Sequence, residues 1–469
     1  ILHRKRGFIV KQDLMRKKNI SDLLERKKNT RLPQTLSAFD LIMLGIGAIV
    51  GTGIFILPGT VAATHSGPAI SISFIIAAFV CCLAGMCYAE FSSKIPVTGS
   101  AYIYTYITFG ELVAWLVGWA LVLEYGLAVA SVATGWSAYF NGLLQGFNIS
   151  IPQALSGPFN PEAGTFINLP AMIIILVLAF FLTRGVREST NLNKIMVFIK
   201  VGIILLFILI GFFYVEPANW RPFMPFGFEG ILSGAAIVFF AFLGFDAVSS
   251  AAEEVKKPQR NLPIGIIGSL FVCALLYVAV SFVLTGIVPY SDLNVSNPVS
   301  YVMQLVNQGW ISGIISIGAI VGMTTVILVM IYAGTRLLFA LSRDGLLPKS
   351  LMNLNASQTP AKSTWTFAII VAIFAGVTPL SQLAELVNMG TLIAFSAVSI
   401  GVIALRQNKQ IPTDGFQVPL YPVLPIITFL ACFFLITQLS ITTWIASFIW
   451  FLIGLFMYFF YGRKNSILK

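Results

Sequence analysis

The sequence predicts an all-α integral membrane protein with twelve transmembrane helices. Of its 469 residues, 57% are hydrophobic and 10% are charged, and the mean hydropathy is +0.89. A soluble domain carries about 25% charged residues, and about 20 consecutive apolar residues suffice to cross a bilayer. Twelve apolar segments can be counted, at 39–63, 68–92, 111–141, 166–183, 193–214, 228–252, 263–288, 310–340, 364–380, 382–405, 422–438 and 442–461.

The basic residues indicate how these spans are oriented. The first 31 residues hold eleven Lys/Arg and no apolar run, which predicts a cytoplasmic arm lying against anionic headgroups rather than a secretory signal. With the N-terminus inside, 27 of the 29 Lys/Arg fall on the cytoplasmic side, and Arg221 falls outside. We therefore expect a multi-pass plasma-membrane protein with both termini in the cytoplasm.

The first segment is interrupted at its centre. Residues 45–55 read GIGAIVGTGIF, so four glycines and a threonine crowd the middle of the span. Each glycine costs about 1 kcal/mol of helix preference. One interpretation is a broken helix whose second half begins near Thr52 and points free N–H groups at a small anion such as a carboxylate. The alternative is close helix packing through the GxxxG pair Gly47 and Gly51.

Two ionisable residues lie deep within the third and fifth segments. Glu124 is midway along 111–141, where it either faces a substrate cavity or forms a hydrogen-bonded strut between helices. Lys200 lies six residues beyond Lys194 in an apolar run, about 9 Å deeper into the span at 1.5 Å per residue. A group at this depth is a functional candidate. The alternative is a lysine that extends to the cytoplasmic surface.

Segment six carries a second set of helix breakers. Residues 239–247 read FFAFLGFDA, which places Gly244 and Asp246 within the span. Segments one and six are five helices apart and therefore cross in opposite directions. Two interrupted helices at matching places in two five-helix halves indicate an inverted-repeat transporter. Segments seven to ten complete the second half, and segments eleven and twelve lie outside the repeat.

The composition argues against several other classes of protein. The five cysteines all lie in apolar runs and there are only two histidines, so no metal, haem or other cofactor is expected. The chain has no Walker A sequence for ATP-driven transport. An ion channel would need repeated filter elements, which the sequence does not show. We expect no enzymatic activity and no nucleic-acid partner.

Several short motifs, in order along the chain, resemble the amino acid–polyamine–organocation superfamily. They are GAIVGTGIF at 47–55, PVTGSAY at 96–102, FD at 245–246 and SRDG at 342–345. The motifs GW at 118–119, LEY at 123–125 and EEVKKP at 253–258 resemble its cationic amino acid transporter branch, bacterial members included. The likeness covers about residues 36–465. It implies a LeuT-type fold, a 5+5 inverted repeat with discontinuous helices 1 and 6, which moves amino acids.

The resemblance implies a substrate site at the two breaks. In the family the first-helix break binds the α-carboxylate, which here implicates Ile49, Gly51, Thr52 and Gly53. The sixth-helix break offers carbonyls to the α-ammonium and an aromatic ring that closes the site, which here implicates Phe239, Phe240 and Ala241. A zwitterion needs donors at one end and acceptors at the other, and two opposed half-helices supply both. Core packing is the alternative for the two phenylalanines.

Four further residues are candidates for coupling and specificity. By the resemblance, Lys200 matches a fifth-helix lysine that takes the place of a sodium ion in proton-coupled relatives. Glu124 would hold a cationic side chain or accept a proton, and Asp246 would tie helices together or relay protons. Met330 matches a position at the side-chain end of the pocket, where methionine favours small or apolar side chains. Ordinary core filling is the alternative for Met330.

The expected function is secondary active amino acid transport by alternating access, with proton symport favoured over sodium symport. The apolar pocket candidates favour a broad, neutral specificity, whereas Glu124 and the branch likeness favour arginine or lysine uptake or exchange. An ion channel or a membrane-embedded enzyme is the alternative from a different class. The expected partners are amino acids, protons and membrane lipids.

The chain divides into three predicted regions. Residues 1–36 are the basic cytoplasmic arm, 37–405 the ten-helix inverted-repeat core, and 406–469 helices eleven and twelve with the C-terminal tail. Acidic residues beside the basic loops, Glu90 and Asp344 among them, are expected to form salt bridges.

Overall fold

The computed structural model describes residues 15–18, 34–97, 99–185, 190–357, 359–408 and 415–468. Most of the predicted basic arm lies outside these residues, as do Thr98 of the PVTGSAY motif and the predicted cytoplasmic residues Arg187, Lys409 and Lys469. Within the described residues the chain is helical, and its only β features are isolated bridges. The prediction of an all-α protein is confirmed.

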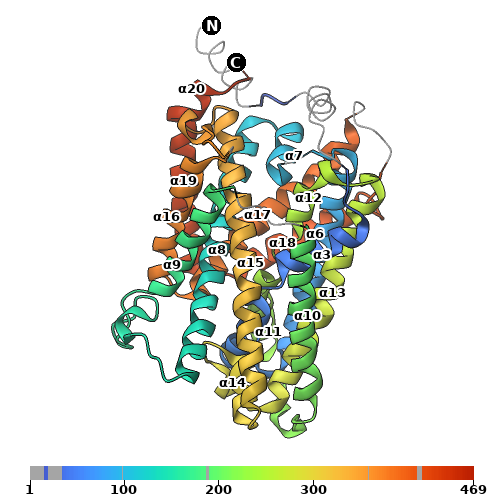
Figure 1. The fold of residues 1–469 in the computed structure, drawn as a ribbon. Coiled ribbons are helices and arrows are strands. Elements are labelled where there is room, and N and C mark those ends of the chain that lie inside the picture. Colours follow the sequence, from blue (N-terminus) through green and yellow to red (C-terminus); the bar gives the residue numbers. More distant parts are fainter. Residues whose placement is uncertain are drawn as a thin grey trace.

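Long helices run side by side along one axis of the molecule (Figure 1). In the described part of the chain, eight helical runs are long and apolar enough to cross a membrane, and four shorter apolar helices accompany them. The long runs include α6 (Ile70–Lys94), α8 (Glu111–Gly146), α10 (Thr190–Phe212), α13 (Pro258–Ile287), α15 (Gly309–Arg343), α17 (Leu380–Gln407) and α19 (Ile441–Met457). The shorter helices are α3 (Ala38–Ile49), α9 (Leu169–Thr183), α16 (Ala361–Val377) and α18 (Val423–Thr437).

The first apolar segment is broken where its glycines lie. α3 begins after Ser37, which forms a capping box with Asp40, and it ends at Ile49. Val50 (ψ 98°) and Gly51 (ψ −138°) leave the helical conformation. The chain then resumes as two short helices, α4 (Thr52–Phe55) and α5 (Leu57–Val61).

The sixth segment is interrupted as well. α11 (Gly227–Val238) passes into the 3-10 turn η5 (Phe239–Phe242), and α12 (Phe245–Ser250) follows. Leu243 is extended, and Gly244 has a φ of 108°. This left-handed conformation carries no steric penalty for glycine. Leu243 and Gly244 therefore turn the chain before α12 begins.

Shorter helices close the two ends of the bundle (Figure 1). α7 (Ser100–Thr108) and α20 (Arg463–Asn465) lie at one end, and α14 (Pro298–Leu305) lies at the other. Within the bundle, α8 packs on α15 and α17, while α13 packs on α3 and α6. The two broken segments are therefore enclosed by long, unbroken neighbours.

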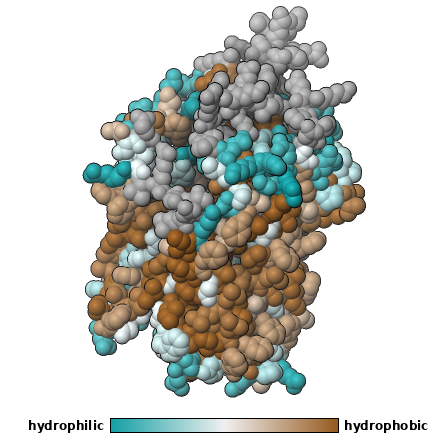
Figure 2. Space-filling view, turned by 45° about the vertical axis from the view of Figure 1, so that its right-hand side comes forward, coloured by the Kyte–Doolittle hydropathy of each residue, from teal (hydrophilic) through white to brown (hydrophobic). Residues whose placement is uncertain are grey.

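The outer surface carries the hydrophobic belt expected of a bilayer-embedded protein. On the face in Figure 2, hydrophobic residues form a broad belt below a hydrophilic rim. Leu209 and Phe212 of α10 and Phe448 and Phe456 of α19 are each at least 60% exposed. So large an apolar surface is not stable in water. Together with the apolar helices, it identifies a multi-pass membrane protein.

Several charged side chains form pairs at the end of the bundle that carries α7 and α20, here called the basic end. Glu90 accepts hydrogen bonds from Arg406, both of 2.8 Å, and from Lys94 at 2.7 Å. Asp344 accepts hydrogen bonds from the Lys18 ammonium and the Tyr102 hydroxyl, both at 2.6 Å. The salt bridges expected at Glu90 and Asp344 are therefore present. Lys18, expected on a headgroup-binding arm, is instead buried against the protein.

Two contacts fasten the start of α3 at this same end. The Leu36 N–H donates to the carbonyl of Glu254 (3.0 Å), and the Lys256 N–H donates to the carbonyl of Leu36 (2.9 Å). These two bonds form a short parallel bridge between the chain entering α3 and the chain leaving α12. In addition, Asp40 of α3 forms an ion pair with Lys194 of α10.

Candidate functional site

The two helix breaks lie against each other inside the bundle. A Cβ atom placed on Gly53 would lie 2.5 Å from the Cα of Ala241, and one placed on Gly244 would lie 3.0 Å from the backbone of Ala48. Real Cβ atoms essentially never approach a backbone to within 2.5 Å, so glycine at position 53 is required for α4 to touch η5 in this way, while the contact at Gly244 is tight. The structure thus brings Gly53 and Ala241, two of the predicted binding residues, into contact.

The hydroxyl of Tyr277 joins the two breaks. It lies 2.7 Å from the carbonyl oxygen of Ala241 and 3.1 Å from that of Ile49. Because a tyrosine hydroxyl has a single proton to donate, the two carbonyls share one donor. Tyr277 lies on α13, so an unbroken neighbour sets the spacing of the two broken helices. Tyr277 was not among the predicted site residues, because it is one of several hydroxyl residues within the apolar segment 263–288.

Lys200 is fully buried beneath the first break. Its ammonium donates to the carbonyl oxygens of Gly47 (3.0 Å) and Val50 (3.3 Å), and its side chain is 0% exposed. These carbonyls lie at the C-terminal end of α3, where intrahelical partners run out and the helix dipole is negative. Gly322 of α15 leaves room for the aliphatic stem. Lys200 therefore caps α3 and does not extend to the surface.

Thr52 begins α4 in an apolar setting. The first N–H groups of a helix have no intrahelical acceptor, so α4 presents donors at its start. Within the described part of the chain, the Thr52 hydroxyl donates to the thioether of Met323 at 3.5 Å, and a thioether is a weak acceptor. Val326 of α15 and Val132 of α8 face Gly51 at van der Waals distance. The walls around these donors are therefore neutral, and Met323 is a lining residue that the sequence analysis missed.

The η5 turn presents backbone carbonyls close to α4. Phe239, Phe240 and Ala241 are all buried. The Phe240 carbonyl accepts from the Leu243 N–H at 3.2 Å, and the Ala241 carbonyl accepts from Tyr277. Each carbonyl oxygen has two lone pairs, so each retains capacity for another donor. The Phe239 ring packs edge-on against Phe395 of α17, with 5.9 Å between ring centroids.

A side-chain amide supports the turn from α17. Asn388 donates from its Nδ2 to the carbonyls of Ala236 (2.7 Å) and Ile237 (3.1 Å) at the end of α11. It thereby holds the last turn before the break, as Lys200 does for α3. In the sequence, Asn388 is an amide in the interior of the apolar segment 382–405.

Glu124 and Asp246 form a second buried group, away from Thr52. Tyr125 donates its hydroxyl to Asp246 at 2.8 Å, and the two carboxyl groups interact electrostatically. Glu124 lies eight residues from Val132 along α8, about 12 Å at 1.5 Å per residue. Among the described residues, Oε2 of Glu124 and Oδ1 of Asp246 have no hydrogen-bond partner. The structure therefore places Glu124 beside Asp246, which lies two residues after Gly244 of the second break, and well along α8 from the first break.

Met330 is also set apart from the first break. It is buried on α15 with 3% of its side chain exposed. It lies seven residues beyond Met323, about 10 Å along the helix. Of the two methionines, Met323 is the one that contacts Thr52.

Apolar helices with two broken segments that meet at the centre of the bundle define a membrane transporter. Residues 36–467 match the amino acid permease family. The chain therefore belongs to the amino acid permease family, whose members are transporters and not enzymes. The predicted resemblance to the superfamily is confirmed.

Three relatives span most of this chain. It is 53% identical over 457 residues to a methylthioribose transporter of Bacillus subtilis (strain 168), covering 97% of this chain and 99% of that protein. It is 49% identical over 465 residues to the branched-chain amino acid permease BcaP of the same organism, covering 98% and 100%. It is 38% identical over 411 residues to the vacuolar cationic amino acid transporter 4 of Arabidopsis thaliana, covering 86% and 68%.

Proposed function

We propose that this protein is a proton-coupled amino acid symporter that favours neutral substrates. The contact between α4 and η5 is the observation that carries this proposal. It sets helix N–H donors beside turn carbonyls in a buried site, as the two ends of a zwitterion require. The α-carboxylate would bind at Gly51, Thr52 and Gly53, and the α-ammonium at the carbonyls of Phe239, Phe240 and Ala241, with Ile49 closing the first break.

The proposed architecture is a LeuT-type transporter of twelve spans. Each broken segment then counts as one span, and the four shorter apolar helices count with the long ones. Residues 37–405 would form the 5+5 repeat and 406–469 the two additional helices with the tail. The basic residues favour a plasma-membrane protein with both termini in the cytoplasm.

The walls of the site favour a neutral side chain. Met323, Val326 and Val132 surround the start of α4. Glu124 lies about 12 Å from Val132 along α8. The branched-chain specificity of the BcaP relative agrees with apolar walls. The alternative, a cationic substrate, is favoured by the Arabidopsis relative and by the bare carboxylate oxygen of Glu124.

A second candidate substrate comes from the methylthioribose transporter. Methylthioribose carries an apolar thioether that suits walls of methionine and valine. It has neither a carboxylate for the start of α4 nor an ammonium for the η5 carbonyls. For this reason we rank it below a neutral amino acid.

Proton coupling is proposed for the buried ionisable residues. Lys200 caps α3 directly beneath the first break, so a change in its protonation would alter how well that half-helix is held. Glu124 and Asp246 provide further proton-accepting oxygens, of which two have no partner in the described residues. Proton transfer would then favour a different arrangement of α3 and α12.

Uptake into proteoliposomes tests the proposal directly. Purified protein should accumulate labelled leucine, valine or alanine when the lumen is alkaline relative to the outside, and a sodium gradient should not replace the proton gradient. Competition with arginine and with methylthioribose would rank the alternatives. Accumulation of arginine alone, or of methylthioribose alone, would contradict a neutral amino acid substrate, and uptake that never saturates would indicate a channel.

A further inference from the structure

A groove runs along the outside of α13 at the basic end of the bundle. It has a volume of about 590 Å³ and is lined by the first three turns of α13 and by Gly415 and Phe416 of the loop before α18. We infer that this groove binds one anionic phospholipid, with the headgroup at Arg260 and an acyl chain along Ile264, Ile267 and Gly268. This inference rests on the membrane location of the protein and is independent of its substrate.

The lining residues form one stripe on the helix. Arg260, Ile264 and Ile267 follow each other at intervals of four and three residues, which places them on the same helical face. From Arg260 to Gly268 the stripe is about 12 Å long at 1.5 Å per residue. The groove begins with the cation of Arg260 beside the polar Gln259, and the lining then continues along α13 with apolar residues. A phospholipid has the matching arrangement, with a charged headgroup followed by a hydrocarbon chain.

The opposite wall of the groove is held in place by the protein. The Phe416 N–H donates to Ser93 Oγ (3.1 Å), and two residues later the Val418 N–H donates to Glu90 (2.8 Å). At the far end, a Cβ atom on Gly268 would lie 3.0 Å from the Ile42 side chain of α3. The groove is therefore formed by fixed neighbours and ends where α13 meets α3.

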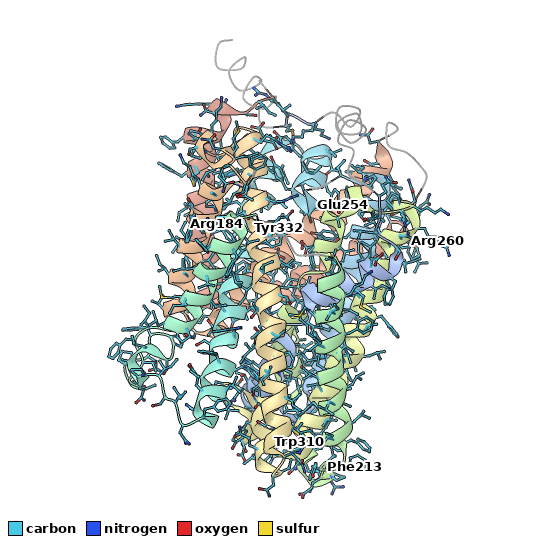
Figure 3. All side chains as sticks on the ribbon, in the orientation of Figure 1. Arg184, Phe213, Glu254, Arg260, Trp310 and Tyr332 are labelled. Carbon is cyan, nitrogen blue, oxygen red and sulfur yellow. The ribbon has the colours of Figure 1, made fainter. Side chains whose placement is uncertain are left out.

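Its position suits a lipid that enters from the bilayer. Ile264 is 41% exposed, and the hydrophilic rim above the hydrophobic belt marks the level of the headgroups (Figure 2). Figure 3 shows Arg260 at the outer edge of the basic end, on the opposite flank from Arg184. An acyl chain in the groove would thus continue directly into the hydrocarbon layer.

The local charge favours an anionic headgroup over a zwitterionic one. Residues 253–260 carry three basic side chains, Lys256, Lys257 and Arg260, and two acidic ones, Glu253 and Glu254. An arginine can also bind a phosphate through two parallel hydrogen bonds. A basic residue near a membrane surface contributes about 1 kcal/mol to the binding of anionic lipid, which corresponds to about five-fold in affinity.

Native mass spectrometry of the purified full chain, titrated with phosphatidylglycerol or phosphatidylcholine of the same acyl chains, tests the inference. One phosphatidylglycerol should bind more tightly than phosphatidylcholine, and Arg260→Ala should weaken the first phosphatidylglycerol about five-fold. Arg184→Ala, which removes an exposed arginine from the end of α9, is the matched control and should change nothing. Equal affinity for the two lipids, or equal losses in the two variants, would overturn the inference.

A second pair of variants tests the acyl-chain part without touching the charge. Ile264→Gln should weaken phosphatidylglycerol binding while leaving proteoliposome uptake measurable. Ile173→Gln, at a 50% exposed position on α9, should not weaken it. If Ile264→Gln binds like the parent chain, the stripe on α13 does not hold the lipid. Binding is read independently of transport, so failure of the proposed symport would leave this test intact.

Discussion

The Lys200 ammonium donates to the Gly47 carbonyl across 3.0 Å, so a cation on α10 caps the end of α3. A break at mid-membrane depth exposes carbonyls that water cannot reach, and such groups are tolerated only when the protein satisfies them. Lys200 supplies donors to two of them. The stability of the break and the charge of Lys200 are therefore linked.

Replacing Lys200 by methionine should abolish proton-driven accumulation. Methionine fills a similar volume but leaves the carbonyls of Gly47 and Val50 without that donor, at a cost of about 1–3 kcal/mol in stability. Uptake into proteoliposomes and thermal unfolding measure the two effects. Lys194→Met on the same helix is the control, because its partly exposed ion pair contributes about 0–1 kcal/mol. Intact gradient-driven uptake by Lys200→Met would remove this lysine from the coupling scheme.

Replacing Thr52 by valine should weaken substrate binding. The substitution keeps the shape of the side chain and deletes the hydroxyl, whose present acceptor is the Met323 thioether. A hydrogen bond to a substrate carboxylate contributes about 1.5–3 kcal/mol, so affinity should fall at least ten-fold in isothermal titration calorimetry. Thr52→Ser retains the hydroxyl and should bind nearly as tightly as the parent protein. Equal affinities for the valine and parent chains would mean that Thr52 only packs.

Replacing Tyr277 by phenylalanine should loosen the contact between the two breaks. The variant loses the donor shared by Ile49 and Ala241, which should lower the free energy of unfolding by about 1–3 kcal/mol and slow transport. Tyr139→Phe is the matched control, because that buried hydroxyl also donates to one carbonyl, of Phe55, but does not join the breaks. Equal transport rates in the two variants would argue against a positioning role for Tyr277.

Replacing Gly53 by alanine should block transport. The new Cβ would lie 2.5 Å from the Ala241 Cα, a backbone atom that cannot move aside as a side chain can. Gly202→Ala on α10 adds the same methyl group where no atom lies within 4 Å, and it should be tolerated. Initial uptake rates measured at equal protein density compare the two variants, and similar rates would show that α4 and η5 need not touch.

The sequence predicted those parts of the fold that depend on local composition. Glycine at 51 and 244 and the apolar runs around them indicate where helices exist and where they stop. Lys200 stood out because an isolated charge in an apolar run is costly without partners.

The sequence could not predict which residues contact each other across different helices. Tyr277, Met323 and Asn388 each lie on a helix remote in sequence from the group they contact. Helical periodicity tells which residues share a face, but not which face meets which neighbour. For the same reason the sequence left open whether Glu124 faces the substrate or forms a strut between helices, and the structure shows that its neighbours are on α12 and α17.

The bridge between Leu36 and the 254–256 segment uses main-chain atoms only. Proline at Leu36 or Lys256 would remove one of these donors, because proline has no N–H, and the buried side chains of Leu36 and Val255 add apolar packing to the bridge. The exposed side chains at this end of the molecule take no part in these two hydrogen bonds. A change in the surface charge here would therefore leave the bonds between the start of α3 and the segment after α12 in place.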